Sequence, residues 1–326
     1  MSAAQDSRVA PGQRLLVIKH GAFGDLIQAD GALRDLRAAH PDWEIVLLTT
    51  PPYRRLMERC PHVDRLLIDR RAPLWRLGEN LQLARALRRE GFARVFDLQK
   101  SGRTAQYRRW VLRGLPWSGR EPGPKPRSMI EGFGPQLAAA GVEATHSRAP
   151  DVSWMAADVS SLLSAQGLQP GYVVLVPGCA ARHPHKRWPH YAALAAELLA
   201  RGHRVVTAPG PDELALAREI PGDCLLGEQG WLDWFELAGV LRQAGFVVGN
   251  DTGPSHLAAC LGRPGLALFG PHPSAERTGI RRGDFDAIEV DVLAELSVER
   301  VLQSVLPRLG QGDGDGATPG PGSSAP

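Results

Sequence analysis

The stretch from 247 to 270 constrains the fold most, because it packs a strand, a polar turn, a helix and a second strand into one short unit. An apolar strand ends before the turn Asn250 to Gly253, and Pro254 follows where the first turn of a helix tolerates a missing N–H. Gly262 ends that helix, and an apolar strand over 265–269 completes the unit. The pattern predicts an α/β protein with parallel strands.

The turn of this unit is the first candidate ligand site. A β–turn–α–β unit directs its turn, and the free N–H groups of the helix start, toward the carboxyl edge of a parallel sheet, where α/β proteins bind phosphorylated ligands. The alternative is that Asp251 or Thr252 only caps the helix, which needs no ligand.

Length and composition favour two globular domains. A chain of 326 residues, 43% hydrophobic and 22% charged, is too long for one ordinary domain and long enough to bury two cores. The helical and strand patterns weaken after 141 and start afresh after Pro170-Gly171. We therefore predict one domain over 1–160, a second over 161–309, and a disordered Gly- and Pro-rich tail over 310–326.

Nothing in the sequence predicts export or membrane insertion. The first residues lack the apolar centre of a signal peptide, and no apolar run approaches the length of a membrane span. The four cysteines are far apart and form no C-x-x-C pair, which indicates reduced thiols. These features favour a cytoplasmic protein.

Charge is distributed unevenly along the chain. Residues 1–150 carry 25 Lys and Arg against 15 Asp and Glu, whereas residues 151–326 carry 13 against 20. The basic half is either a solvated surface or the side that meets an anionic partner, such as a phosphorylated glycolipid at a membrane face. Nucleic acid is a poorer candidate, because no nucleic-acid-binding motif is present and the second half is acidic.

The first βα loop carries a candidate catalytic residue. A continuous apolar strand over 14–19 is followed by His20 to Asp25, with glycines at Gly21 and Gly24, and then by a predicted helix reaching about 40. The loop lacks G-x-G-x-x-G, which argues against a nicotinamide dinucleotide. Asp25 either caps the helix or places a carboxylate at an interdomain cleft, able to take a proton from a hydroxyl.

Alternating elements continue through the first half and predict a doubly wound parallel sheet. The segment 116–127 reads as a loop at the carboxyl edge of that sheet, where contacts to a second substrate gather. The predicted elements are strand 44–49, helix 54–59, strand 65–69, helix 75–90, strand 94–98, helix 104–112 and helix 130–140. The candidate cations for this edge, each equally explained as solvated surface, are Arg103, Arg108, Arg109, Arg120 and Arg127.

A second candidate anion site lies in the loop 177–189 of the second series, between strand 172–176 and helix 190–201. A Pro-Gly turn, a basic run that includes Lys186, and a proline before the helix combine positive charge with open N–H groups. Cys179, His183 and His185 lack a fourth ligand at useful spacing, so we predict no metal. The remaining predicted elements are strand 204–208, helix 212–219, strand 224–226 and helix 234–243.

Three of these motifs together resemble glycosyltransferase family 9, whose best-known members are the lipopolysaccharide heptosyltransferases. D-T-G-P-S-H-L-A-A from Asp251, continued by G-R-P-x-L-A-L-F-G-P, resembles the C-terminal signature of the family. Strand-G-x-x-G-D-helix resembles its N-terminal signature, in which the aspartate is the catalytic base, and P-G…K-x-W-P resembles its donor phosphate loop. The chain departs from the commoner pattern at Gln28-Ala29-Asp30-Gly31, where many heptosyltransferases carry His-Thr-x-Pro.

The resemblance implies a GT-B fold, in which two Rossmann-like domains face a cleft, and an inverting sugar transfer without a cofactor. Asp25 would be the base and Lys186 a ligand of the donor diphosphate, with ADP-heptose as the first candidate donor and a lipopolysaccharide core or related anionic glycan as acceptor. Contact with the inner face of the membrane is expected. The residues expected to bind the donor are Gly24, Gly178, Lys186, Asp251, Thr252, Gly253, Ser255 and His256.

Two other functions suit the same pattern. A two-domain binding protein could close on a sugar or nucleotide without chemistry, and a nucleotide-sugar epimerase of the same fold would form product from the donor alone. An assay with and without acceptor distinguishes these from a transferase.

Overall fold

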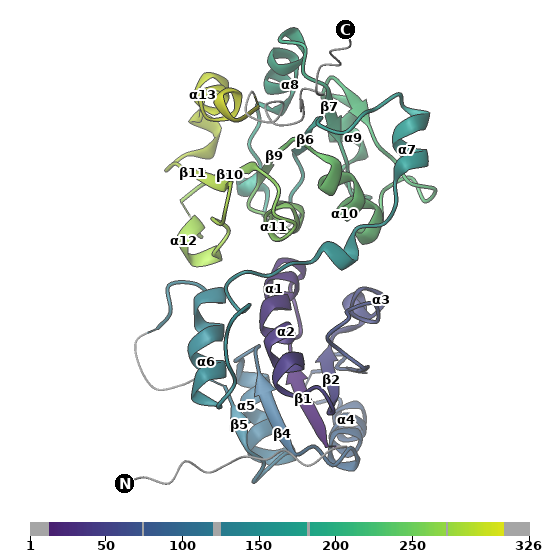
Figure 1. The fold of residues 1–326 in the computed structure, drawn as a ribbon, viewed down its shortest axis with the longest axis vertical. Helices are drawn as coiled ribbons and strands as arrows, with labels where there is room; N and C mark the ends of the chain where they lie inside the picture. Colours follow the sequence, from purple (N-terminus) through teal and green to yellow (C-terminus); the bar gives the residue numbers. More distant parts are fainter. Residues whose placement is uncertain (1–12, 74, 120–124, 181–182, 272, 310–326) are drawn as a thin grey trace, which may run out of the picture.

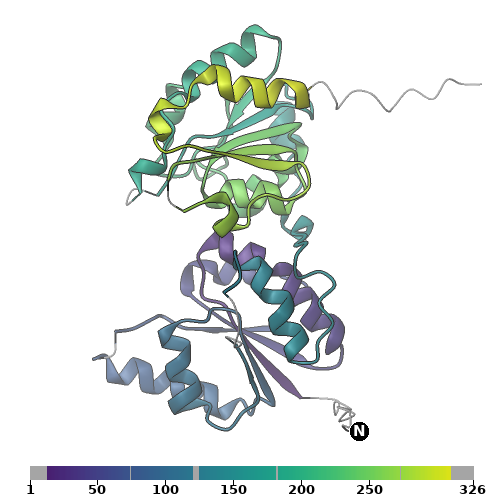
Figure 2. The same ribbon diagram turned by 90° about the vertical axis from the view of Figure 1, so that its left-hand side faces the viewer.

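Two parallel sheets, each covered by helices on both faces, form the body of the molecule (Figures 1 and 2). The computed structural model describes residues 13–73, 75–119, 125–180, 183–271 and 273–309. The predicted tail 310–326, Arg120 and the first residues of the chain lie outside this part. The first sheet ends at residue 118 and the second begins at 173, which confirms two doubly wound α/β units facing each other.

The N-terminal sheet has the strand order β3-β2-β1-β4-β5, and all of its pairs are parallel. The order reverses between β1 and β4, so the loops that follow these two central strands diverge at the carboxyl edge. Its elements are β1 (Arg14–Ile18), α1 (Phe23–Gln28), α2 (Asp30–Ala39), β2 (Glu44–Thr49), α3 (Arg54–Met57), β3 (Arg65–Ile68), α4 (Leu77–Arg89), β4 (Arg94–Asp97), α5 (Gly102–Gln106), a π-helical segment (Tyr107–Val111), β5 (Trp117–Ser118) and α6 (Phe133–Ala139).

The C-terminal sheet has the order β11-β10-β9-β6-β7-β8, again entirely parallel. Here the reversal lies between β6 and β9. Its elements are α7 (Ser160–Ala165), β6 (Val173–Val176), α8 (Tyr191–Ala200), β7 (Val205–Thr207), α9 (Leu214–Arg218), β8 (Asp223–Cys224), α10 (Trp234–Gln243), β9 (Phe246–Asn250), α11 (Gly253–Cys260), β10 (Gly265–Phe269), α12 (Ala275–Thr278), β11 (Phe285–Glu289) and α13 (Val298–Leu309).

One continuous apolar cluster joins the two units. It runs from the α2 and α6 face of the N-terminal sheet, through Phe23 and Leu26 of α1 and Leu257 of α11, to the α10 face of the C-terminal sheet. The outer faces have separate clusters, one under α4 and the π-helical segment and one under α8 and α13. Because buried apolar surface crosses between the units at α1 and α11, the two helices hold the carboxyl edges of the sheets against each other.

Several predicted elements were wrong in extent or were missed. The predicted helix reaching 40 is two helices that break at Ala29, because the residues on either side of the break make separate tertiary contacts, described below. Part of the predicted loop 116–127 is β5, whose two residues pair with β4. The elements that we did not predict are α7, α12, β11 and α13.

Within the described part of the chain, no helix is both long enough and apolar enough to cross a bilayer. The cysteines at 60, 179, 224 and 260 are all free.

Candidate active site

A cavity of about 770 Å³ lies between the two units. Its N-terminal wall includes Ala22, Phe23 and Gly24 at the start of α1. Its C-terminal wall is formed by segments that follow β6, β7, β8 and β9, at the carboxyl edge at which doubly wound sheets bind their ligands. The other chemically notable lining residues are Arg55, Gly178, Lys186, Glu213, Trp234, Asp251, Thr252 and Gly253.

Lys186 and Asp251 form an ion pair at the C-terminal wall. Lys186 Nζ lies 2.5 Å from Asp251 Oδ2, and His256 Nε2 lies 3.5 Å from Asp251 Oδ1. Burial alone would raise the pKa of Asp251, but the hydrogen bonds from His256 and Lys186 outweigh it and lower that pKa below its ordinary value. Asp251 therefore holds the ammonium group of Lys186 at the cavity as a fixed positive charge.

The start of α11 adds a second source of positive potential. Thr252 is the N-cap residue, but no side chain caps the helix, and Thr252 and Gly253 line the cavity. The partial positive charge of a helix N-terminus and its open N–H groups attract phosphate. Asp251 bonds to Lys186 and His256 instead of capping α11, so the structure does not support the alternative in which this turn serves only as a cap.

Buried Asn250 fixes the loops around this wall. Its amide nitrogen donates to the carbonyl oxygens of Pro177 and Gly178, at 2.9 and 3.1 Å, and its Oδ1 accepts from the backbone N–H of Trp188. The hydroxyl of Ser255 is fully buried and donates to the backbone oxygen of Asn250 at 2.6 Å. Ser255, predicted to bind donor, thus lies behind the cavity and supports its wall.

Glu213 places a carboxylate in the cavity that sequence reasoning missed. Its Oε2 accepts from the N–H of Gly210 at 3.0 Å. A Cβ on Gly178 would lie 1.8 Å from Glu213 Oε1, so a larger residue at 178 would force the Glu213 carboxylate to move. A carboxylate at this place can accept hydrogen bonds from sugar hydroxyl groups. No motif near 213 signals this, because the residue depends on the fold of the loop after β7.

Close packing of α1 on α11 brings the two walls together. A Cβ on Gly253 would lie 2.7 Å from Phe23 Cδ1, and a Cβ on Gly24 would lie 3.2 Å from His256 Cδ2. Phe23 stacks on Trp234 of α10 with ring centres 3.8 Å apart. Two glycines at the crossing therefore allow the helix that carries Asp25 to touch the helix that begins at the cavity.

Asp25 lies one residue beyond the cavity lining, in the first turn of α1. The N-cap residue is Ala22, so the alternative in which Asp25 caps the helix is wrong: the helix begins three residues earlier than the sequence suggested. The Asp25 side chain is 48% exposed, and its Oδ2 lies 3.8 Å from the amine of Lys19. Burial lowers the pKa of Lys19, against the opposing effect of Asp25 and Asp97, and its amine also contacts Met129 Sδ at 3.0 Å.

The segment that departs from the common family pattern lies at the junction of the units. Gln28 Nε2 is 2.6 Å from His256 Nδ1. Because an amide nitrogen can only donate, Nδ1 accepts and the ring proton is on Nε2, facing Asp251. Asp30 accepts a hydrogen bond from the indole N–H of Trp154 at 2.9 Å. At Gly31 the chain packs closely against the segment that connects the two units, because a Cβ there would lie 2.1 Å from a backbone oxygen of that segment.

The structure thus brings most of the predicted donor residues together. Gly24, Gly178, Lys186, Asp251, Thr252 and Gly253 line one cavity, with His256 and Ser255 directly behind it. Asp25 is adjacent to this set on α1. Among the described residues, no group of three His, Cys, Asp or Glu side chains could hold a metal ion.

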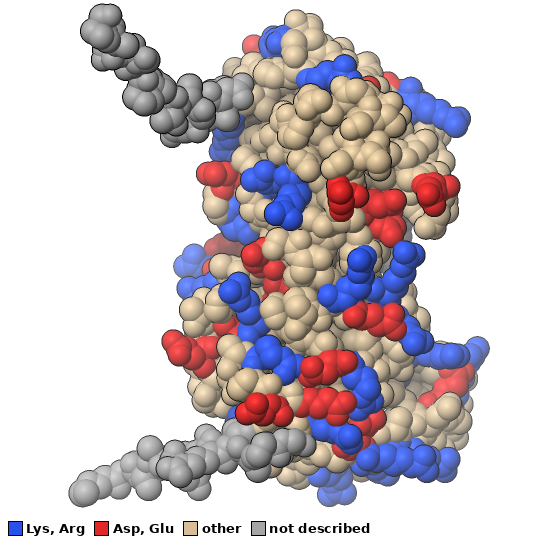
Figure 3. Space-filling model, turned by 45° about the vertical axis from the view of Figure 1, so that its right-hand side comes forward, with Lys and Arg blue, Asp and Glu red and all other residues tan. Residues whose placement is uncertain are grey.

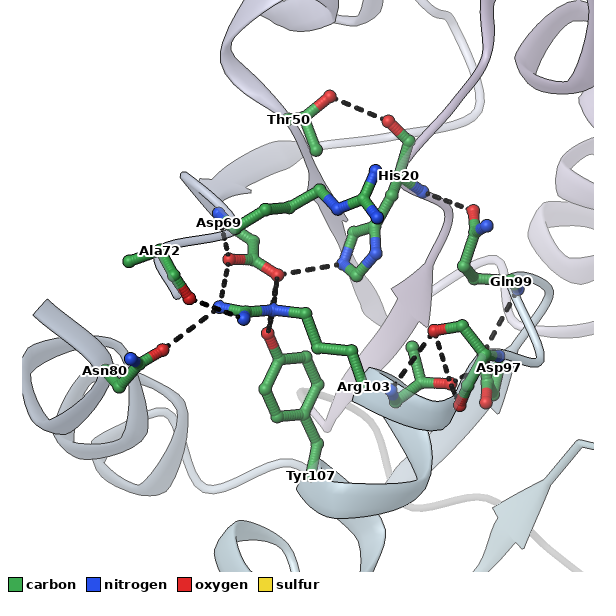
Figure 4. A network of polar contacts seen from close by, with 12 residues as sticks. His20, Thr50, Asp69, Ala72, Asn80, Asp97, Gln99, Arg103 and Tyr107 are labelled. Atoms are coloured by element: carbon green, nitrogen blue, oxygen red, sulfur yellow. Dashed lines mark hydrogen bonds and ion pairs between the residues drawn. The ribbon is translucent and has the colours of Figure 1, made fainter. Parts of the chain in front are cut away.

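A buried polar network anchors the loop that leads to Asp25 (Figure 4). The backbone of His20 accepts from Thr50 Oγ1 at 2.7 Å and donates to Gln99 Oε1 at 2.9 Å, and its Nε2 lies 3.2 Å from Asp69 Oδ2. Arg103, one of the cations proposed for substrate contact, donates twice to Asp69 at 2.8 Å and is thereby committed to this network.

The His20 ring predicts a measurable pH dependence of stability. Burial lowers the pKa of His20 to about 4, with Asp69 opposing. A histidine whose pKa is depressed on folding contributes stability above its unfolded pKa of about 6.5 and loses it as the pH falls toward the folded pKa, so between pH 7 and 5 the expected loss is about 2 kcal/mol.

Between pH 7 and 5, we expect the free energy of unfolding to fall by about 2 kcal/mol less in the His20→Gln variant than in wild type. Urea unfolding of both proteins at the two pH values measures this difference. Burial also lowers the pKa of His62 to about 4 and raises that of Asp30 to about 6, and both groups are present in both proteins. The difference therefore isolates His20, and equal slopes in the two proteins would contradict the assignment.

Comparison with known proteins identifies relatives of this chain. The model of glycosyltransferase family 9 (heptosyltransferase) matches residues 135–284, which contain the Lys186 loop and α11. Lipopolysaccharide heptosyltransferase 2 of Escherichia coli K12 is 27% identical over 302 residues, covering 79% of this chain and 83% of its own length. The chain is thus similar to the lipopolysaccharide heptosyltransferases of glycosyltransferase family 9. It is therefore a glycosyltransferase.

Solved structures show that this glycosyltransferase has the GT-B fold. A family 9 glycosyltransferase of Veillonella parvula superposes with a TM-score of 0.76 at 20% identity, over 92% of this chain and 97% of its own. The E. coli heptosyltransferase WaaC with ADP gives 0.70 at 20% identity, over 91% and 100%. Both likenesses concern the fold.

Proposed function

We propose that this glycosyltransferase transfers a heptose from ADP-heptose, with inversion, to an anionic glycan of the lipopolysaccharide core. The observation that carries the proposal is the cavity in which Lys186 and the start of α11 meet, because it presents a fixed cation and open N–H groups to a diphosphate. The similarity to lipopolysaccharide heptosyltransferase 2 and to a heptosyltransferase solved with ADP supports the choice of sugar and nucleotide.

The proposed reaction is a single displacement. Asp25 takes the proton of an acceptor hydroxyl while the oxygen of that hydroxyl forms a bond to the anomeric carbon of the sugar. At the same time the bond between the anomeric carbon and the diphosphate breaks, and its electron pair leaves with ADP. Lys186 and the N–H groups at 252–253 stabilise the negative charge that develops on the leaving diphosphate. Attack from the face opposite the leaving group inverts the anomeric centre.

The acceptor would approach from the N-terminal side. The excess of cations in residues 1–150 supports an anionic acceptor and contact with the inner face of a membrane. Asp25 lies on this side of the cavity, on α1, while the diphosphate ligands belong to the C-terminal unit. The two substrates would therefore meet at the crossing of α1 and α11.

A thermal-shift screen with ADP, UDP, GDP and ADP-heptose tests the donor. A ligand that binds only the native state raises its apparent stability by about 2.7 kcal/mol at one hundred times its Kd. ADP and ADP-heptose should raise the melting temperature more than the other nucleotides. A larger shift with UDP or GDP would refute ADP-heptose as the donor while leaving the assignment to the glycosyltransferases intact.

Gln28 should contribute to donor affinity from across the domain junction. Gln28→Leu removes the amide N–H group that fixes the tautomer of His256. A hydrogen bond of this kind contributes about 0.5–1.5 kcal/mol, so ADP affinity should fall about three- to tenfold. Calorimetry of ADP binding measures this, and the ¹⁵N shifts of the His256 ring report the tautomer. The exposed Gln106 gives a matched control, Gln106→Leu. Unchanged shifts and affinity in Gln28→Leu would remove Gln28 from the site.

A further inference from the structure

The four most exposed large hydrophobic side chains of the described chain lie in one region of the N-terminal unit. They are Trp75 (81% exposed), Leu77 (67%), Trp110 (56%) and Leu81 (52%). Leu77 and Leu81 belong to α4, Trp75 directly precedes it, and Trp110 is in the π-helical segment. Single exposed apolar residues need no explanation, but a group of four with two tryptophans indicates an interaction surface.

The geometry of α4 makes these residues continuous. Leu77, Leu81, Arg85 and Arg88 are spaced by four, four and three residues, which places them along one side of the helix. Arg88 at the end of this row donates to the backbone oxygen of Trp110 at 2.7 Å. The row therefore leads from the start of α4 to Trp110, whose ring lies 4.7 Å from the Arg109 guanidinium.

The charge around this row has one sign. In the described residues 70–73 and 75–113, all nine ionisable side chains that are classed as exposed are arginines. The acidic residues of this stretch are half-buried or buried, and Glu90, for example, is bound by Arg65. Figure 3 shows many Lys and Arg side chains along the right and lower edges of the N-terminal unit, with Asp and Glu between some of them.

This combination fits the surface of an anionic bilayer. Tryptophan and arginine both have an apolar body and a polar end, which suits them to the headgroup region, and basic residues are attracted to the negative surface potential of an anionic membrane. A second copy of the chain would bring arginines against arginines. Nucleic acid would leave the leucines without a partner.

We propose that the surface made by Trp75, Leu77, Leu81, Arg85, Arg109 and Trp110, here called the α4 surface, docks on an anionic lipid bilayer. The α4 surface begins just after β3, and the carboxyl ends of β1 and β3 lie at the same sheet edge, where α1 carries Asp25. An acceptor anchored in the membrane would thus be presented on the side of Asp25. This last step rests on the proposed function, whereas the docking itself does not.

Vesicle co-sedimentation tests the docking without any substrate. Wild type should bind vesicles of phosphatidylcholine and phosphatidylglycerol (70:30), bind pure phosphatidylcholine at least tenfold more weakly, and lose most binding in 0.5 M NaCl. Trp75→Ser/Leu81→Ser and Arg85→Gln/Arg109→Gln should each weaken binding to the anionic vesicles at least tenfold. In wild type, tryptophan emission should shift to the blue on binding.

Matched controls lie on the C-terminal unit. Leu226→Ser/Val292→Ser removes exposed apolar side chains there, and Arg218→Gln/Arg300→Gln removes exposed charge, so both should bind as wild type does. Each variant is checked by its melting temperature and by ADP binding. The proposal would be overturned if the α4-surface variants and the control variants lost vesicle binding equally, or if wild type did not bind anionic vesicles. So would a concentration-dependent dimer that the α4-surface variants abolish, because it would assign this surface to a second copy. Failure here leaves heptose transfer untouched, since that is assayed separately.

Discussion

Asp25→Asn should lower turnover by about two to four decades while donor affinity stays near the wild-type value. The amide keeps the shape of the side chain but cannot accept the acceptor proton. The stability cost should stay near 1 kcal/mol, because Asp25 is not the N-cap, and the substitution removes only a charge in the first turn of α1 and a neighbour of Lys19 at 3.8 Å.

The control for this variant is Asp42→Asn, an exposed aspartate elsewhere on the N-terminal unit. Its turnover should equal that of wild type. Initial rates over a range of donor and acceptor concentrations give kcat and KM, and calorimetry with ADP gives the affinity of the donor site. Near-wild-type turnover in Asp25→Asn would falsify the catalytic role of Asp25.

Lys186→Ala should weaken binding of ADP and of the sugar donor by one to two decades. A charge-assisted contact to phosphate contributes about 1.5–3 kcal/mol. The substitution also leaves Asp251, buried and without its cation, beside the site of the diphosphate, which adds repulsion. The loss of affinity should therefore be larger for ADP than for AMP, because AMP places less phosphate charge near Lys186.

Lys186→Arg is the matched variant for this measurement. It keeps the charge near Asp251 and should recover most of the ADP affinity, which calorimetry measures alongside the alanine variant. Equal ADP affinity in wild type and Lys186→Ala would remove Lys186 from the diphosphate site. A lowered melting temperature in both variants without a difference in affinity would assign it a structural role only.

The sequence predicted the parts of the site that depend on local pattern. The Gly262 stop, the Pro254 start and the apolar strands of the β9–α11–β10 unit all obey rules of neighbouring residues, and the structure has them with small shifts of boundary. The Lys186 loop was recognisable because charge, turn and proline occur together. Strand β11 and helix α13 were missed, although Val298, Val301, Leu302 and Val305 recur at helical spacing.

Long-range contacts were beyond the sequence. Gln28 and His256 are 228 positions apart, and nothing local to either residue announces their bond. The Glu213 carboxylate packs against Gly178, which lies on another loop. The sequence suggested that Arg103 is a surface cation, but its side chain binds Asp69, which directly follows strand β3. In each case a partner brought close by the fold decides the role.

ADP release by the wild-type enzyme, measured with and without a lipopolysaccharide inner core that lacks its heptoses, tests acceptor-dependent transfer from ADP-heptose. We expect ADP release only when the acceptor is present, equal in amount to the heptose attached. Conversion of ADP-heptose at the same rate without acceptor would indicate an epimerase or hydrolase, and tight ADP-heptose binding with no reaction in either case would indicate a binding protein. Either result would contradict the account.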